Sequence, residues 1–179
     1  PVIKALAARY GQTFMGENPA SPQRLPRISI DTYKPAVMQA AVAAGAHMIN
    51  DVNALQTAGA LQAAAELAVP VVLMHKQGTP QTMQQAPHYT DVVREVKDFL
   101  QRRVDACLAA GIAQSHIVLD PGFGFGKTAA HSLTLLKHLD EIIALGFPVL
   151  VGLSRKSLIK QVVGTGYGAA VNERLAGSL

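Results

Sequence analysis

Short apolar runs alternate along the chain with longer segments in which apolar residues recur every three or four positions. The short runs are expected to be strands, at residues 28–30, 47–49, 69–73, 117–119 and 147–151. The longer segments are expected to be helices, at residues 35–44, 58–68, 91–110, 129–145 and 157–163. Strands and helices in alternation, with short connections, predict parallel βα units and therefore an α/β fold.

One domain is expected to contain all of these elements, residues 1–179. Residues 11–26, rich in glycine, proline, serine and asparagine, are expected to be a surface insertion within it. Residues 2–9 have the pattern of a helix already under way, and residues 172–179 are helical in character without a capping signal. We therefore expect further strands of this domain before Pro1 and after Leu179.

A polar residue stands at the end of every predicted strand. These residues are Asp31, Asn50 with Asp51, His75, Asp120 and the run from Ser154 to Ser157. In parallel sheets the carboxyl ends of the strands share one edge, where ligands bind. A single Asp or Asn after a strand is common, because these residues form turns. Polar residues after five successive strands instead predict a binding site.

The loop from Asp120 to Lys127 is the most specific local pattern, with three glycines alternating with two phenylalanines. Glycines let the backbone approach a ligand closely, and the rings can wall an apolar pocket. A P-loop would need glycine where Pro121 stands, and a dinucleotide fingerprint would need glycine in place of Lys127. The alternative is a glycine-rich turn with two core phenylalanines.

Composition narrows the class of protein. With 179 residues, 49% hydrophobic and 16% charged, the chain can bury one sizeable core. A net charge of +4 without basic runs argues against a nucleic-acid surface and fits an anionic small molecule. No apolar run is long enough to span a membrane. The single cysteine, Cys107, excludes an internal disulfide, is expected to be a packed thiol and is compatible with a cytoplasmic protein.

Five segments together resemble dihydropteroate synthase, a family of pterin-binding enzymes. They are residues 28–32, 48–52, 73–78, 119–127 and 151–157, and their order, spacing and strand context match the family from Ile28 to Leu179. Asp-Pro-Gly-Phe-Gly-Phe-Gly-Lys and Ser-Arg-Lys-Ser are the most specific of these segments. The resemblance implies a (β/α)8 TIM-type barrel, of which this chain would supply about five βα units, rather than an open doubly wound sheet.

The resemblance also implies an activity. The family's transferases join 4-aminobenzoate to 6-hydroxymethyl-7,8-dihydropterin diphosphate, giving 7,8-dihydropteroate and pyrophosphate in folate biosynthesis, and are targets of sulfonamides. We therefore expect a cytoplasmic homodimer that binds these small molecules and neither nucleic acid nor membrane. Mg2+ is the expected cofactor. Its site would lie before Pro1, with no metal ligand within this chain.

Site residues are carried over by position. The pterin would be bound by Asp31, Asn50, Met74, Asp120, Gly152 and Lys156. The 4-aminobenzoate would be bound by Gly124, Phe125, Arg155 and Ser157. Lys156 and Arg155 are the expected catalytic residues, and Lys127 ranks behind them for anion binding.

The residue types suit this chemistry. A pterin presents an exocyclic amine beside a ring N–H, and one carboxylate such as Asp120 can accept from both. Asn50, with a donor and an acceptor, can match a neighbouring edge. Phe125 offers a face to the benzoate ring, and Lys156 a positive charge near the reacting centre. No covalent nucleophile is needed to displace a good leaving group.

Several residues have a second interpretation. Asp31 could cap the helix that begins near Pro35, and Asp51 is expected to be structural. His75 could contact the ligand or be a neutral, hydrogen-bonded residue at the strand end. Arg174 could serve a helix face, a subunit contact or the site. The remaining histidines lack metal-ligand spacing and are expected to be surface or packing residues, at positions 47, 88, 116, 131 and 138.

Two other functions remain open at this point. A folate-dependent corrinoid methyltransferase domain also places Asp and Asn at strand ends. The second alternative is a non-catalytic pterin-binding or scaffold fragment. Taken as 179 residues alone, the chain is expected neither to close a barrel nor to catalyse the reaction.

Overall fold

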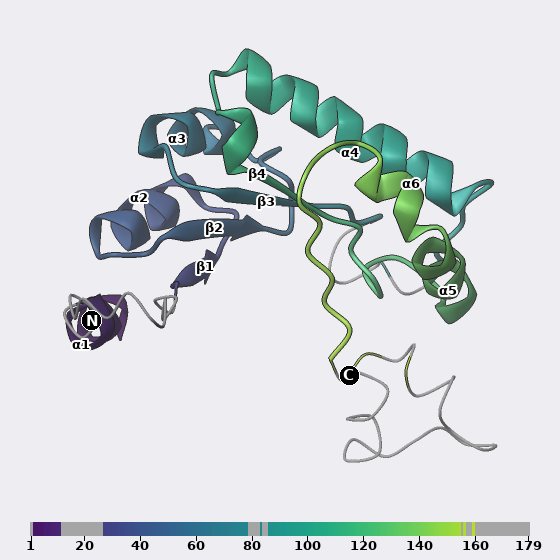
Figure 1. Cartoon of the computed structure of the whole chain (residues 1–179), viewed down its shortest axis with the longest axis horizontal. Coiled ribbons are helices and arrows are strands. Elements are labelled where there is room, and N and C mark those ends of the chain that lie inside the picture. Colours follow the sequence, from purple (N-terminus) through teal and green to yellow (C-terminus); the bar gives the residue numbers. More distant parts are fainter. Residues whose placement is uncertain are drawn as a thin grey trace, which may run out of the picture.

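A four-stranded parallel sheet forms the centre of the computed structural model, which describes residues 2–11, 27–78, 83, 86–154, 156 and 159 (Figure 1). Its strands are β1 (Ser29–Asp31), β2 (Met48–Asp51), β3 (Val71–Met74) and β4 (Ile117–Asp120). They lie side by side in chain order, and every neighbouring pair is parallel. A doubly wound sheet reverses its strand order at a switch point, so this order is that of a barrel wall.

Helices connect the strands. They are α1 (Val2–Gly11), α2 (Pro35–Ala43), α3 (Ala60–Leu67), α4 (Val92–Ala109), α5 (Ala129–Lys137) and α6 (Leu139–Ile143), with the short 3-10 helix η1 (Gln114–His116) before β4. Helix α4 starts where its sequence predicts, because the Asp91 carboxylate accepts a hydrogen bond from the Arg94 backbone N–H at 3.0 Å. Among the described residues, no helix has both the length and the apolar character needed to cross a bilayer.

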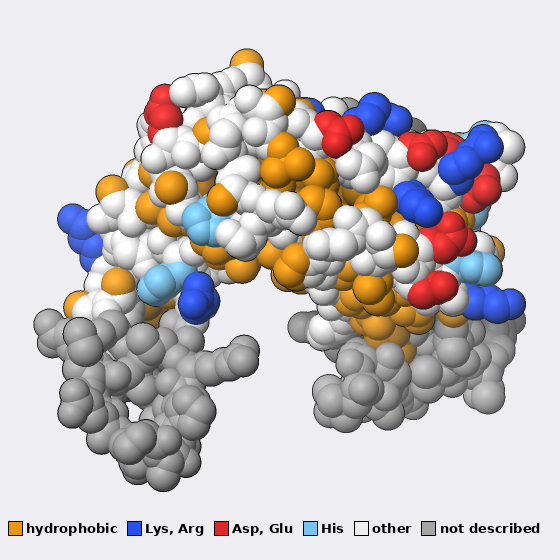
Figure 2. All heavy atoms as spheres, turned by 45° about the horizontal axis from the view of Figure 1, so that its top comes forward, with side chains coloured by type: hydrophobic (Ala, Val, Ile, Leu, Met, Phe, Trp, Pro, Cys, Tyr) orange, Lys and Arg blue, Asp and Glu red, His pale blue; other side chains and the backbone are white. Residues whose placement is uncertain are grey.

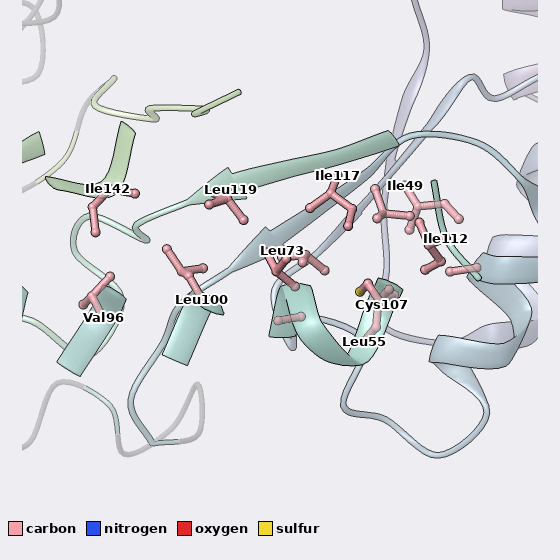
Figure 3. Packing of buried hydrophobic residues seen from close by; sticks show 14 of the residues in the cluster. Ile49, Leu55, Leu73, Val96, Leu100, Cys107, Ile112, Ile117, Leu119 and Ile142 are labelled. Atoms are coloured by element: carbon pink, nitrogen blue, oxygen red, sulfur yellow. The ribbon is translucent and has the colours of Figure 1, made fainter. Parts of the chain in front are cut away.

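One hydrophobic core fills the space between the sheet and the helices (Figure 3). Strand residues such as Leu73 and Leu119 are wholly buried against Val96 and Leu100 of α4. Burying each such side chain stabilises the fold by about 1.5–3 kcal/mol. Cys107 of α4 is also fully buried, and burial raises the pKa of its thiol to about 11, so the expected packed thiol is confirmed.

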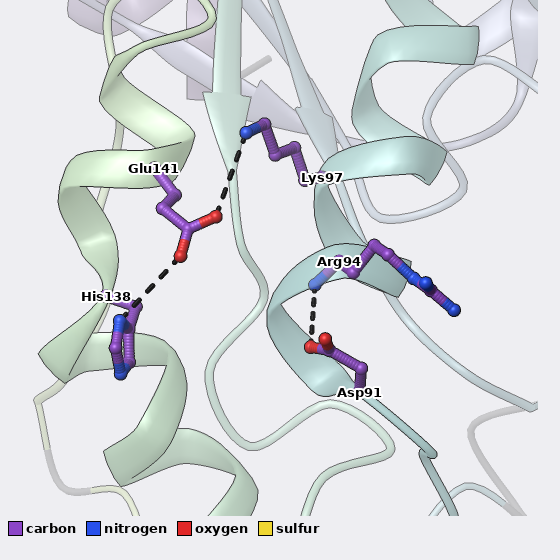
Figure 4. Close-up of polar contacts among 5 residues, drawn as sticks. All are labelled: Asp91, Arg94, Lys97, His138 and Glu141. Carbon is purple, nitrogen blue, oxygen red and sulfur yellow. Dashed lines mark hydrogen bonds and ion pairs between the residues drawn. The ribbon is translucent and has the colours of Figure 1, made fainter.

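Charged side chains cover the outside of this helical layer. Acidic and basic groups are mixed there (Figure 2), and Glu141 lies 3.7 Å from both Lys97 and His138 (Figure 4). These pairs are more than a third exposed, so each stabilises the fold by at most about 1 kcal/mol. A groove of about 500 Å³ between α4 and the α5–α6 segment is lined mainly by these charged groups and lies on the helical layer, not at the strand ends.

The first four predicted strands are confirmed, and each of the four observed strands ends one or two residues later than predicted. Asp31, Asn50 with Asp51, Met74 and Asp120 are therefore the last residues of the strands. The fifth predicted strand, 147–151, makes a single parallel bridge from Val149 to Leu119. It is held by a 2.8 Å hydrogen bond from Leu150 N–H to the Leu119 carbonyl.

One helix prediction is wrong. Residues 129–145 form two helices instead of one, because His138 leaves the helical conformation at φ −111° and ψ 32°. Asp140 and Glu141 then lie in the first turn of α6, where negative charge is favoured. The predicted helices at 35–44, 58–68 and 91–110 and the helical pattern of 2–9 are confirmed within two residues at each end. The helix expected at 157–163, apart from Ile159, and the insertion at 11–26, apart from Gly11, lie outside the described residues.

Candidate functional site

The sheet has one face toward the helices and one face turned away from them. Successive strand side chains alternate between faces. The helix-side face is formed by core residues, namely Ile30, Ile49, Val71, Leu73, Ile117 and Leu119. The strand register pairs Asp31 with Asn50, Asn50 with Val72, and Met74 with Asp120, so all of these lie on the opposite face. Four predicted pterin-binding residues therefore share the inner face of the barrel wall at its carboxyl edge.

Asp51 follows Asn50 directly and points the other way. Its carboxylate is fully buried and accepts hydrogen bonds from the backbone N–H groups of Asn53 at 2.7 Å and Leu55 at 3.0 Å. Arg103 of α4 binds the same turn through the Ala54 carbonyl at 2.8 Å. Asp51 thus organises the turn after β2, and its expected structural role is confirmed.

The Asn50 side chain has an acceptor that the described residues leave unpaired. Its Oδ1 atom is buried and has no hydrogen-bond partner among them. Leaving a buried polar group unpaired costs about 1–3 kcal/mol. An acceptor in this state at the sheet edge is suited to a ligand's donor.

Asp120 is a buried carboxylate, 8% exposed, at the end of β4. Burial raises its pKa, while the hydrogen bond from Gly122 and the charges of Lys156 and Lys127 act in the opposite direction. One oxygen accepts the Gly122 N–H at 2.7 Å, which fixes the orientation of the carboxyl group. A buried carboxylate near two lysine charges can bind paired N–H donors strongly.

The glycines of the following loop permit close backbone contacts with the end of β3. Gly122 has φ +67°, and a Cβ atom there would lie 1.9 Å from the His75 carbonyl oxygen. Gly126 has φ +62°, and its Cβ would lie 2.4 Å from the Gln77 carbonyl oxygen. Both positions therefore require glycine for conformation and for space.

The two phenylalanines of this loop have different roles. Phe123 is fully buried in the hydrophobic core, so the prediction that both rings wall a pocket is wrong for this residue. Phe125 is half-buried, and the Nζ atom of Lys156 lies 4.6 Å from its ring centroid. Gly124, with φ +77°, lies between them in a turn closed by the hydrogen bond from Phe125 N–H to the Gly122 carbonyl at 3.1 Å.

Lys156 lies close to several of the predicted binding residues. Its ammonium group donates a hydrogen bond to the Phe123 carbonyl. Burial lowers its pKa, and the Asp120 carboxylate raises it. A Cβ atom on Gly124 would lie 3.4 Å from Lys156 Cδ, and one on Gly152 would lie 3.9 Å from Lys156 Nζ. Gly124 and Gly152 thus both lie beside Lys156.

Some predicted site residues are not shown to lie with Asp120, Phe125 and Lys156. Asp31 is exposed, although it lies beside Asn50 in the register. It does not cap α2, whose N-cap is Lys34 without a side-chain hydrogen bond, so that alternative is not supported. Arg155, Ser157 and Arg174 lie outside the described residues.

His75 and Lys127 form a buried pair behind the loop, with 2.8 Å between Nδ1 and Nζ. The His75 ring packs edge-on against Phe99 of α4, with centroids 5.0 Å apart. Burial and the Lys127 charge lower the pKa of His75 to about 3, so the imidazole is neutral. The structure therefore favours a neutral, hydrogen-bonded residue over a ligand contact.

The burial of Lys127 was not predicted from the sequence. The one local feature that could have indicated it is the position of this lysine at the end of a glycine-rich loop. Within the described part of the chain, no three His, Cys, Asp or Glu side chains gather closely enough to hold a metal ion.

The βα order is that of the wall of an α/β barrel, and the fold class expected from the sequence is confirmed. Residues 20–179 match the sequence profile of the pterin binding enzyme family, and the chain belongs to this family. The resemblance to dihydropteroate synthases is likewise confirmed. The chain is 45% identical over all its 179 residues to the dihydropteroate synthase of Escherichia coli strain K12, covering 57% of that protein.

Two solved dihydropteroate synthase structures resemble this chain in fold as well as in sequence. A dihydropteroate synthase from Stenotrophomonas maltophilia with imidazole bound in its active site superimposes with a TM-score of 0.85 at 50% identity. The superposition covers 99% of this chain and 61% of the S. maltophilia protein. The Xanthomonas albilineans enzyme in complex with 7,8-dihydropteroate gives a TM-score of 0.83 at 47% identity, with coverage of 99% and 58%. The chain thus spans somewhat more than half the length of these relatives.

Proposed function

We propose that the protein containing this chain is a dihydropteroate synthase, a transferase that joins 4-aminobenzoate to 6-hydroxymethyl-7,8-dihydropterin diphosphate and releases pyrophosphate. One observation carries the proposal: buried Asp120, the unpaired Asn50 acceptor and Lys156 above the Phe125 ring belong to one carboxyl-edge site. The relatives support it, since solved X. albilineans enzymes hold 4-aminobenzoic acid or 7,8-dihydropteroate.

Pterin binding is assigned to the inner face. The Asp120 carboxylate would accept hydrogen bonds from the pterin's exocyclic amine and adjacent ring N–H, with the Gly122 N–H holding it in place. Asn50 Oδ1 would accept from a neighbouring donor. Met74, the ladder partner of Asp120, supplies an apolar side chain for the ring, while Asp31 lies at the open rim. Gly152 keeps space clear beside the Lys156 ammonium group.

Binding of 4-aminobenzoate is assigned to the Gly124–Phe125 segment together with Arg155 and Ser157. The Phe125 ring offers an apolar face to the benzoate ring. Lys156, held between this ring and the Asp120 charge, is within reach of both substrates. Arg155 and Ser157, on either side of Lys156 in sequence, would bind the carboxylate.

The reaction needs positioning and charge stabilisation. The amine nitrogen of 4-aminobenzoate attacks the pterin methylene carbon, the C–O bond to the diphosphate breaks, and pyrophosphate leaves with the electron pair. The amine loses one proton. Lys156, with Arg155, would stabilise the negative charge that develops on the leaving oxygen. Mg2+ is the proposed cofactor, but the described residues provide no site for it and no step here depends on it.

We further infer that the protein is cytoplasmic and a homodimer, and that sulfonamides compete with 4-aminobenzoate. A solved Yersinia pestis dihydropteroate synthase in complex with a sulfonamide drug supports the last point. Competition kinetics with a sulfonamide would test it directly, and light scattering would measure the molar mass in solution.

The activity is tested by incubating the full-length protein with both substrates and Mg2+. We expect equal amounts of pyrophosphate and 7,8-dihydropteroate. Tight pterin binding without pyrophosphate release would indicate a non-catalytic scaffold. Methyl transfer from methyltetrahydrofolate would indicate the corrinoid-dependent class instead.

A further inference from the structure

Lys127 is a buried lysine, 3% exposed, whose ammonium group bonds to backbone carbonyls and to His75 and has no assigned contact with either proposed substrate. Its ammonium group lies 2.8 Å from His75 Nδ1, 3.0 Å from the Gly122 carbonyl oxygen and 3.2 Å from the Phe125 carbonyl oxygen. The His75 carbonyl lies 3.4 Å away. All of these partners are neutral: two are carbonyls of the loop, and the other two are the ring nitrogen and the carbonyl of His75, so Lys127 bridges the loop and the residue that follows β3.

The partner of Lys127 is itself fixed. His75 is neutral, and its Nδ1 atom lies within hydrogen-bond distance of the Lys127 ammonium nitrogen. Its ring packs against Phe99, with centroids 5.0 Å apart, and against Tyr89, with centroids 6.1 Å apart. The Tyr89 hydroxyl donates to the Gly126 carbonyl at 2.8 Å. The loop is thus held by His75, which follows β3, and by Tyr89, which precedes α4.

The carbonyl groups of the loop connect this buried network to the site. Lys127 binds the carbonyls of Gly122 and Phe125, and Lys156 binds that of Phe123, which lies between them. Moving the Phe125 backbone would therefore move its ring relative to Lys156, which lies 4.6 Å from the ring centroid. The shape of the loop determines the geometry of the 4-aminobenzoate subsite.

We propose that Lys127, paired with His75, is a positioning residue for 4-aminobenzoate, holding residues 122–126 so that the Phe125 ring faces Lys156. This inference rests on the proposed function and adds a role for a residue that touches neither substrate. A lysine after a glycine-rich loop could instead bind a phosphate group, but the Lys127 ammonium is enclosed by its four acceptors. Burial lowers its pKa to about 7, with Asp120 raising it and Lys156 lowering it, so its charge is poorly suited to hold an exposed anion.

Lys127→Met tests the proposal, because methionine keeps much of the volume and removes every donor. We expect the KM for 4-aminobenzoate to rise about tenfold or more, since small displacements of a binding group have large kinetic effects. Pterin affinity measured by calorimetry should fall by a clearly smaller factor, about twofold, because the strand ladder holds Asn50 and the Asp120 backbone and only the Gly122 N–H contact to Asp120 depends on the loop. A matched control is Lys137→Met at an exposed lysine in the last turn of α5, which should leave both quantities unchanged.

A second variant keeps the proposal testable if Lys127→Met fails to fold. His75→Gln leaves the Lys127 bonds to the Gly122 and Phe125 carbonyls and should raise the same KM by a smaller factor, about threefold. An unchanged KM in the folded variants, or an equal loss of pterin and 4-aminobenzoate binding, would overturn the positioning role. A wild-type protein that forms no dihydropteroate would instead overturn the proposed function and this inference with it.

Discussion

Lys156 places its ammonium nitrogen 4.6 Å from the centroid of the Phe125 ring, while the same nitrogen donates a hydrogen bond to the Phe123 carbonyl. A charge in this position is close to an apolar face on one side and to the buried Asp120 carboxylate on the other. The two proposed substrates differ in the same way, one being a flat benzoate ring and the other a donor-rich pterin. The contact thus joins the two subsites through one side chain.

Gly122→Ala should disrupt the site by a direct clash. The new Cβ would lie 1.9 Å from the His75 carbonyl oxygen, at a φ of +67°. We expect a loss of about 1–3 kcal/mol in the free energy of unfolding, together with weaker pterin binding because Gly122 N–H orients Asp120.

The matched control is Gly111→Ala, whose φ of +87° is equally left-handed but whose Cβ would meet nothing within 4 Å. This variant should lose only about 1 kcal/mol from backbone strain and bind pterin normally. Chemical denaturation and calorimetry measure both quantities. Equal destabilisation of the two variants would show that the contact with His75 is unimportant.

Much of this site could be predicted from the sequence pattern, but its details depend on contacts between residues that are far apart in the sequence. Polar residues at strand ends could be predicted because the carboxyl edge of a parallel sheet is shared. That Asn50 rather than Asp51 faces inward was expected from the family resemblance, whereas the strand pattern alone does not give it, since adjacent strand residues point oppositely and only the register decides. The burial of Lys127 depends on His75, 52 residues away, whereas a lysine in a polar loop is usually exposed.

The stability of the protein should rise with pH in a way that depends on Lys127. The folded protein releases the Lys127 proton near pH 7, whereas the unfolded chain keeps it until about pH 10.5. Stability from this group is therefore fully present above pH 10.5 and is lost as the pH falls toward 7. Of the facing groups, His75 titrates at lower pH, while burial raises the pKa of Asp120 and lowers that of Lys156.

Urea denaturation of the wild type and Lys127→Met from pH 7 to 10 measures this effect. The wild type should gain free energy of unfolding relative to the variant as the pH rises. Cys107, whose pKa is raised to about 11, contributes to both proteins and cancels in the difference. A difference that is flat, or that shrinks with rising pH, contradicts the effect of burial on Lys127.

Ala68→Gly should stabilise the protein. Ala68 ends α3 with φ 50°, a left-handed conformation that strains residues with a Cβ atom, and its side chain is exposed. Glycine at this position should add about 0.5–1 kcal/mol to the free energy of unfolding. Ala40→Gly, at an exposed position inside α2, should instead remove about 1 kcal/mol. Thermal unfolding of both variants gives the comparison, and a destabilised Ala68→Gly protein would contradict the expectation.

The most direct test of the site is the pterin affinity of Asp120→Ala and Lys156→Ala, measured by isothermal titration calorimetry. Asp98→Ala, at an exposed carboxylate on α4, serves as the control. Asp120→Ala and Lys156→Ala should lose measurable pterin binding while unfolding cooperatively like the wild type, and the control should bind normally. Unchanged pterin affinity in both site variants would contradict the assignment of this carboxyl-edge cluster as the pterin site.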